Sequence, residues 1–151
     1  MKVTNPRNII CSISGLREGS LSIDYFKDVK ESEIFHKALE NIAKKRGDLG
    51  SNYKKYYDFI QPVFEGNEHF NKKLLYLACV LSHMDWGLGA FQKAELVFQE
   101  TINTPLLRLT HKERIQLALS CYWRYCSIKY NPKMEYLTFL NNNEIFSSKQ
   151  V

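Results

Sequence analysis

A histidine and an aspartate separated by one residue form the pair in this sequence best suited to hold a metal ion. His83 and Asp85 flank Met84, and His69 and His111 are available as further ligands. A divalent metal that binds oxyanions and activates a water molecule needs such nitrogen and oxygen ligands. A histidine beside an aspartate at a helix end also forms a hydrogen-bonded structural pair. The sequence leaves both interpretations of His83 and Asp85 open.

Basic residues form clusters that suit a polyanion. The candidate binding residues are Lys44, Lys45, Arg46, Lys54 and Lys55, and a third cluster follows at Lys72 and Lys73. If these side chains converge on one face, they make a positively charged groove for a polyanion. Lysines in the last turn of a helix also stabilise the negative end of its dipole, so the first cluster has a structural explanation as well.

A charged pair stands between two glycines near the start of the chain. Arg17 and Glu18 lie between Gly15 and Gly19, after the apolar β-type run 9–13. Glycine adopts positive φ at no steric cost, so the backbone can turn sharply on either side of the pair. The pattern predicts a strand that ends at a surface with a fixed charge, or an ion pair between Arg17 and Glu18 that fixes the turn.

Other catalytic patterns are missing from the sequence. The seven glycines form no phosphate-binding loop, and no nucleophile elbow or Cys-His dyad is found. The four cysteines include no CxxC pair, so we expect buried thiols in a reducing compartment. The sequence therefore argues against independent hydrolysis by nucleophilic catalysis.

Composition indicates one folded domain. The 151 residues are 44% hydrophobic and 25% charged, with a net charge of +5. This modest surplus tolerates polyanions but also fits an ordinary solvated surface. Neither a membrane-spanning run nor a signal peptide is evident, so we expect a cytoplasmic protein. The aromatic residues have helical spacing typical of a core, which makes nucleic acid an unlikely partner.

Apolar periodicity predicts helices along most of the chain. The expected ranges are 32–46, 51–64, 74–81, 90–102, Thr110 to about Tyr130, and Pro132 to Leu140. Gly47 is expected to end the first helix. Ser51 is expected to cap the second helix, and Pro62 to break it. The run 74–81 is apolar all round and is expected to be central. Thr110 and Glu113 have the spacing of a capping box. Phe91, Ala94, Val97, Phe98 and Ile102 are expected on one buried face.

Only in residues 8–23 does the sequence pattern predict β structure. A single strand or hairpin is marginally stable in water unless it packs on helices or joins a sheet. The segment is therefore expected either to dock on the helices of its own chain or to pair with another chain through an exposed edge.

Four runs in the same order resemble the exopolyphosphatase/guanosine pentaphosphate phosphohydrolase family. They are Gly15-Leu16-Arg17-Glu18-Gly19, Tyr57-Asp58-Phe59-Ile60-Gln61-Pro62-Val63-Phe64, Leu75-Tyr76-Leu77-Ala78-Cys79-Val80-Leu81-Ser82-His83-Met84-Asp85-Trp86, and Leu109-Thr110-His111-Lys112-Glu113-Arg114-Ile115-Gln116-Leu117-Ala118-Leu119. In the third run the sequence departs from the family's Ser-Asp-Ile-Gly-Trp form, because His83 replaces the aspartate and Asp85 replaces the glycine.

The resemblance implies a mainly α fold, an HD-like bundle of about six helices with a short N-terminal β-strand or hairpin. Residues 1–24 would be the end of a missing actin-like domain with a linker, and residues 25–151 the helical C-terminal domain. Family members cleave terminal phosphates of polyphosphate or of guanosine pentaphosphate in a magnesium-dependent cleft between two actin-like domains. That cleft is absent from this sequence, so the chain alone is expected to be inactive and to hold no cofactor.

The implied role is an accessory one in a bacterial phosphohydrolase. The chain would help to bind polyphosphate or guanosine pentaphosphate, with Arg17 near the domain boundary reaching a phosphate. It would also contact upstream actin-like domains, a partner chain or a second copy of itself. Two alternatives remain open: an autonomous HD-like metal-dependent phosphohydrolase that uses His83 and Asp85, and a truncated gene product that only folds.

Overall fold

The computed structural model describes residues 20, 29, 31–45, 47, 52–65, 71–82, 87–106, 109–127, 130 and 134–150. Regular structure in these ranges is helical. The elements are α2 (Glu31–Lys45), α4 (Tyr53–Ile60), the 3-10 helix η1 (Gln61–Phe64), α5 (Lys72–Leu81), α6 (Ala90–Asn103), α7 (His111–Trp123), α8 (Met134–Leu137) and α9 (Asn142–Gln150). The prediction of a mainly α chain is confirmed for the described residues.

The expected N-terminal strand falls almost wholly outside the described residues. Of the segment 8–23, only Ser20 is described, and its backbone is helical. The strand and the boundary at residue 24 therefore stay predictions.

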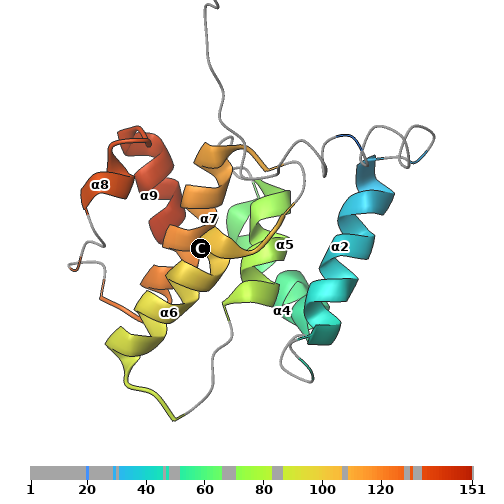
Figure 1. The fold of residues 1–151 in the computed structure, drawn as a ribbon, viewed down its shortest axis with the longest axis horizontal. Coiled ribbons are helices and arrows are strands. Elements are labelled where there is room, and N and C mark those ends of the chain that lie inside the picture. The colour runs from blue at the N-terminus through green and yellow to red at the C-terminus, as the bar shows by residue number, and fades with distance from the viewer. Residues whose placement is uncertain are drawn as a thin grey trace, which may run out of the picture.

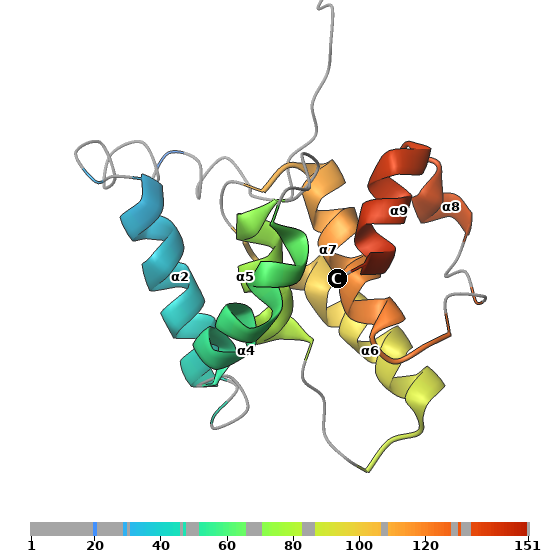
Figure 2. The same cartoon turned by 180° about the vertical axis from the view of Figure 1, so that it is seen from behind.

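The helices pack in two groups on either side of α7. In Figures 1 and 2, α2, α4 and α5 lie on one side, and α8 and α9 lie on the other. Helix α6 packs along α7, and α5 and α9 each contact α7 as well. The arrangement makes α7 the helix that joins the two groups.

The ends of α2 and α4 follow local rules. Gly47 has a φ of 63°, and its N–H donates to the carbonyl of Lys44, which confirms the predicted stop. The predicted cap at Ser51 is wrong, because the N-cap position of α4 is Asn52. Pro62 ends α4 as predicted, and the chain continues as the 3-10 turn η1.

Helix α5 is the buried central element that its apolar sequence predicts. The side chain of Asn71 caps it by accepting from the N–H groups of Lys73 and Leu74. Six residues are buried: Leu75, Leu77, Ala78, Cys79, Val80 and Leu81.

Helix α6 buries Ala94, Val97 and Phe98 as predicted, with Ile102 half-buried. The prediction for Phe91 is wrong, since 59% of this residue is exposed. Phe91 lies in the first turn, where the helix begins beyond the edge of the core.

Helix α7 is buried on two faces. Leu117 and Cys121 belong to a core shared with α2, α4 and α5. A second core includes Ile115, Ala118, Leu119, Tyr122 and Trp123, together with Ala94 and Phe98 of α6 and Leu140. The helix begins with the predicted capping box, in which Thr110 Oγ1 accepts from the N–H of Glu113 and the Glu113 carboxylate accepts from the N–H of Thr110.

The predicted continuation of this helix to Tyr130 is wrong. It ends at Trp123, and the carbonyl of Tyr122 then accepts hydrogen bonds from the N–H groups of both Tyr125 and Cys126. The Trp123 indole N–H donates to the carbonyl of Tyr130, so the chain folds back over the helix end.

The predicted last helix, from Pro132 to Leu140, is also only partly correct. In its place the structure has the single turn α8 and the unpredicted helix α9. Asn141 and Glu144 form a reciprocal cap at the start of α9: Asn141 Oδ1 accepts from the N–H of Glu144, and Glu144 Oε2 accepts from the N–H of Asn141. The Asn-x-x-Glu spacing was the available sequence signal for this helix.

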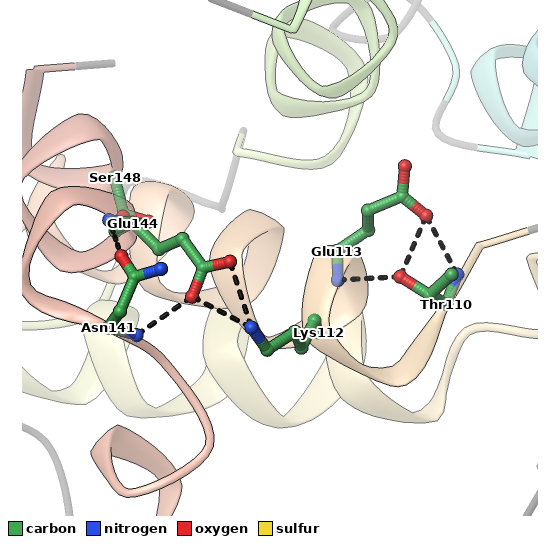
Figure 3. A network of polar contacts seen from close by, with 6 residues as sticks. All are labelled: Thr110, Lys112, Glu113, Asn141, Glu144 and Ser148. Atoms are coloured by element: carbon green, nitrogen blue, oxygen red, sulfur yellow. Dashed lines mark hydrogen bonds and ion pairs between the residues drawn. The ribbon is translucent and has the colours of Figure 1, made fainter. Parts of the chain in front are cut away.

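Figure 3 shows how the caps of α7 and α9 are joined. Lys112 Nζ, in the first turn of α7, donates to both carboxylate oxygens of Glu144, at 3.0 and 3.2 Å. The Ser148 hydroxyl donates to the Glu144 carbonyl one turn further along α9. The hydrogen bond from the Asn141 N–H, together with Lys112, holds the pKa of Glu144 below its usual range, against the opposing effect of burial.

We expect Glu144→Gln to lower the free energy of unfolding at pH 7 by about 1 kcal/mol, because it weakens one cap and removes one partly exposed ion pair. A carboxyl group with a lowered folded-state pKa stabilises the fold above its unfolded pKa, and this stabilisation is lost as the pH falls through the folded value. The difference between variant and wild type should therefore shrink between pH 7 and pH 3 in urea denaturation followed by circular dichroism. Glu135→Gln, at an exposed position of α8, is the matched control. A difference in the free energy of unfolding that stays constant with pH would contradict the lowered pKa assigned to Glu144.

Candidate functional site

Four of the candidate polyanion-binding lysines lie at two neighbouring helix ends. Lys44 and Lys45 occupy the last turn of α2, and Lys54 and Lys55 the first turn of α4. All four are exposed. Figure 2 shows the end of α2 near the start of α4, so the two pairs of lysines lie at neighbouring helix ends. We call these four residues the lysine corner.

The lysine corner has acidic neighbours one helical turn away, Glu40 for Lys44 and Asp58 for Lys54, but makes no ion pair with them. Among the described residues, no carboxylate lies within ion-pair distance of its four ammonium groups. Lys54 Nζ lies 5.9 Å from the centre of the Tyr53 ring. The first turn of α4 has no acidic residue, so the positive end of that helix dipole adds to the charges of Lys54 and Lys55, whereas the negative end of the α2 dipole partly offsets those of Lys44 and Lys45. The arrangement suits a polyanion whose many oxygens each make a weak contact with an ammonium group.

The third basic cluster lies elsewhere. Lys73, at the start of α5, places its Nζ 5.8 Å from the ring centre of Phe35, in the second turn of α2. Phe35 precedes Lys44 by nine residues, which is about 14 Å along a helix. Lys72 and Lys73 are therefore separate from the lysine corner, and the three clusters do not form one groove.

Several candidate residues lie outside the described part of the chain. Arg17, Arg46, His69, His83 and Asp85 belong to this group. Their proposed roles in phosphate or metal binding therefore stay predictions. Within the described ranges, no group of three or more His, Cys, Asp or Glu side chains could hold a metal ion.

The described histidines and cysteines have the surroundings expected of structural residues. His111 is exposed as the first residue of α7, and its ring lies edge-on to Phe139 at 5.6 Å. Cys79 and Cys121 are buried, Cys126 is half-buried, and none of these three described cysteines forms a disulfide. The prediction of buried thiols is confirmed for Cys79 and Cys121.

Sequence reasoning missed a cavity of about 240 Å³ between α4, α5 and α7. Its lining residues are Tyr56, Ile60, Leu75, Ala78, Cys79, Ser82, Ser120 and Arg124. They come from three helices, and only tertiary packing brings them together. No short motif could have indicated this cavity.

The polar side of the cavity is organised around Ser82. Arg124 Nη1 donates to the Ser82 hydroxyl at 2.6 Å, and the Tyr125 hydroxyl donates to the Ser82 carbonyl. Ser82 is the buried C-cap of α5, so both contacts join α7 to the end of that helix. Burial raises the pKa of the Cys79 thiol to about 11, although nearby Arg124 acts in the opposite direction. The thiol is therefore neutral near pH 7.

Arg114 stabilises the fold and is not part of a surface site. Only 3% of this arginine is exposed, and its guanidinium donates to the carbonyls of Ile102, Thr104 and Leu106. Burial lowers its pKa. This arginine is part of the fourth family-like run, and the structure shows that it fastens the end of α6 and the segment after it to α7.

Comparison of the chain with protein-family models, curated proteins and solved structures finds no match. In the described ranges, none of the helices combines the length and apolar character needed to cross a membrane.

Proposed function

We propose that the chain is a helical accessory domain that binds polyphosphate through the lysine corner. In this proposal it serves a phosphohydrolase of the exopolyphosphatase type and does not cleave phosphate by itself. The observation that carries the proposal is the lysine corner: two adjacent helix ends present four exposed ammonium groups without ion-pair partners in the described residues. The resemblance of the four sequence runs supplies the phosphohydrolase context.

Lysine chemistry favours polyphosphate as the ligand. An ammonium group is a compact point charge on a flexible stem, so it can follow successive phosphates without a fixed geometry. Guanosine pentaphosphate would also present a base, which proteins commonly hold by stacking on an aromatic ring. Tyr53, whose ring Lys54 approaches, is 5% exposed and offers no open face. A base would have to stack on an exposed ring of α4, Tyr56 or Phe59, so the preference for a plain phosphate chain rests on the lysine chemistry alone.

An apolar surface near the lysine corner supports the proposed contact with another domain or subunit. Phe59 in α4 and Val63 in η1 are four residues apart, and their exposures are 84% and 80%. Contiguous exposed apolar patches often mark interaction surfaces, and these two side chains are the candidates for such a patch. We assign this pair to contact with an upstream actin-like domain or a second copy of the chain.

Paired lysine substitutions test the binding site. We expect K44Q/K45Q and K54Q/K55Q each to weaken long-chain polyphosphate binding about tenfold, since each removes two exposed charge contacts of about 0.5–1 kcal/mol. The matched control is K37Q/K72Q, which removes the same charge from other exposed positions and should change affinity less than about twofold. Fluorescence polarisation at two salt concentrations measures the effect, and binding by the wild type should weaken as salt rises. Equal losses of polyphosphate affinity in all three variants would show that binding depends only on general charge attraction. That result would refute the lysine corner as the binding site.

Phosphate release distinguishes the accessory role from the phosphohydrolase alternative. The purified chain is incubated with polyphosphate, with and without magnesium or manganese. We expect no turnover. Turnover that disappears in Asp85→Ala would instead establish an enzyme with a metal site at His83 and Asp85.

A further inference from the structure

We propose that the cavity between α4, α5 and α7 binds a small, mostly apolar monocarboxylic acid, with its carboxylate on Arg124. This site uses none of the lysine-corner residues and does not depend on the proposed function. The argument rests on the walls of the cavity, its charge and its size.

The walls of the cavity are largely apolar. Leu75 and Ala78 from α5 are buried, and Ile60 from α4 is half-buried. The Cys79 thiol adds a small neutral surface, because its raised pKa keeps it protonated near pH 7. An apolar ligand body would leave water for such a surface at a gain of about 25 cal/mol per Å².

The polar end has a single formal charge. Arg124 is the only charged residue among the described lining residues. One of its five N–H groups is used by Ser82, and among the described residues no carboxylate pairs with it. A guanidinium group presents a planar fork of donors that matches the two oxygens of a carboxylate.

Arg124 also stands on the solvent side of the cavity. It is exposed, as is Tyr56, whereas Leu75 and Ser82 are buried. The ligand carboxylate can therefore stay near water while the apolar body fills the interior. One positive charge balances a monoanion, and an anion of higher charge would be left uncompensated beside apolar walls.

The size of the cavity selects a small ligand. Its volume is about 240 Å³. Since a water molecule takes up about 30 Å³ of liquid, this space matches about eight water-sized groups, and its open side beside Arg124 leaves room for a slightly larger molecule. The volume is also below the usual range for drug-sized ligands, which begins at about 300 Å³. Benzoate, a short branched fatty acid or a similar monocarboxylate has the required size and polarity.

Calorimetric titration of the full chain with benzoate tests the site. We expect benzoate to bind at least about tenfold more tightly than benzyl alcohol, its neutral counterpart, and than inorganic phosphate. Arg124→Gln should abolish the preference for benzoate over benzyl alcohol, while Arg124→Lys should retain part of it. Lys45→Gln removes the same charge from the lysine corner and should leave benzoate binding unchanged.

A cavity-filling variant provides independent evidence of location. Ala78→Met places a larger side chain in the cavity and should weaken both benzoate and benzyl alcohol, with the helical circular dichroism spectrum confirming that the variant folds. In wild type, benzoate should shift the methyl signals of Leu75 and Ala78 in NMR spectra. Failure of benzoate to bind the folded wild type, equal binding of acid and alcohol, or full benzoate affinity in Arg124→Gln would each overturn the proposal. None of these results would bear on polyphosphate binding at the lysine corner.

Discussion

Replacing Arg114 by methionine is expected to lower the free energy of unfolding by about 3–5 kcal/mol, the cost of breaking a buried charged network. Its guanidinium donates to the carbonyls of Ile102, Thr104 and Leu106, and the bond to Leu106 is 2.9 Å long and buried. Methionine fills similar space but removes the guanidinium donors from all three carbonyls, of which that of Thr104 keeps the N–H of Leu106 as a donor. Urea denaturation followed by circular dichroism at 222 nm measures the change.

Two control variants separate this effect from the simple loss of an arginine. Arg124→Met removes an exposed arginine with one hydrogen bond to Ser82 and should cost less than about 1.5 kcal/mol. Arg114→Lys keeps the charge but cannot reproduce the guanidinium fork, so its stability should lie between those of the wild type and Arg114→Met. If Arg114→Met lowered the free energy of unfolding no more than Arg124→Met does, Arg114 would not stabilise the fold through its buried hydrogen bonds, and the assignment would be wrong.

Raising the pH from 8 to 11 is expected to destabilise the protein markedly, with about 2–3 kcal/mol of the loss due to Cys79 alone. Burial raises the pKa of this thiol from 9.0 to about 11, and one pKa unit corresponds to about 1.4 kcal/mol. Above pH 9 the unfolded chain releases the thiol proton while the folded chain still holds it. The stabilisation is therefore complete below pH 9 and is lost as the pH rises to 11.

Cys79→Ala isolates the thiol from the tyrosines. Burial also raises the pKa of Tyr122 to about 12, so both proteins should lose stability in strong base. The variant should lose about 2–3 kcal/mol less than the wild type between pH 8 and pH 11 in urea denaturation with reducing agent present. Equal losses in the two proteins would show that Cys79 does not contribute.

Local sequence signals predicted the helices whose limits are set by nearby residues. Gly47 ends α2, Pro62 ends α4, and the Thr110–Glu113 box begins α7, each by backbone geometry or a short-range hydrogen bond. The uniform apolar character of α5 also indicated its central burial. In these places the local preference and the tertiary environment agree.

The misjudged helices depend on contacts between distant segments. The apolar pattern continues past Trp123, but the chain turns there and its Tyr130 carbonyl accepts from the Trp123 indole. Helix α9 has a polar sequence and a weak periodic pattern. It is held by its Asn141 cap and by the ion pair from Glu144 to Lys112, which is 32 residues away. Such long-range partners cannot be read from periodicity.

The candidate sites also include features that local sequence predicts and features that only tertiary packing creates. Exposure of Lys44 and Lys54 could be predicted from their positions at polar helix ends, and the short connection between α2 and α4 keeps those ends near each other. The cavity could not be predicted, because Ile60, Ala78 and Arg124 meet only after three helices have packed. The inward position of Arg114 was also unpredictable, since a charged residue in a first turn is usually exposed.

The double burial of α7 makes the two sides of the molecule one cooperative unit. Leu117 is part of one core and Leu119 of the other, so neither core can come apart without exposing a face of the same helix. Local opening at α9 or at the start of α2 leaves this helix covered on at least one side. We therefore expect the amide hydrogens in the middle of α7 to exchange with solvent through complete unfolding, so that their exchange rate reports on global stability.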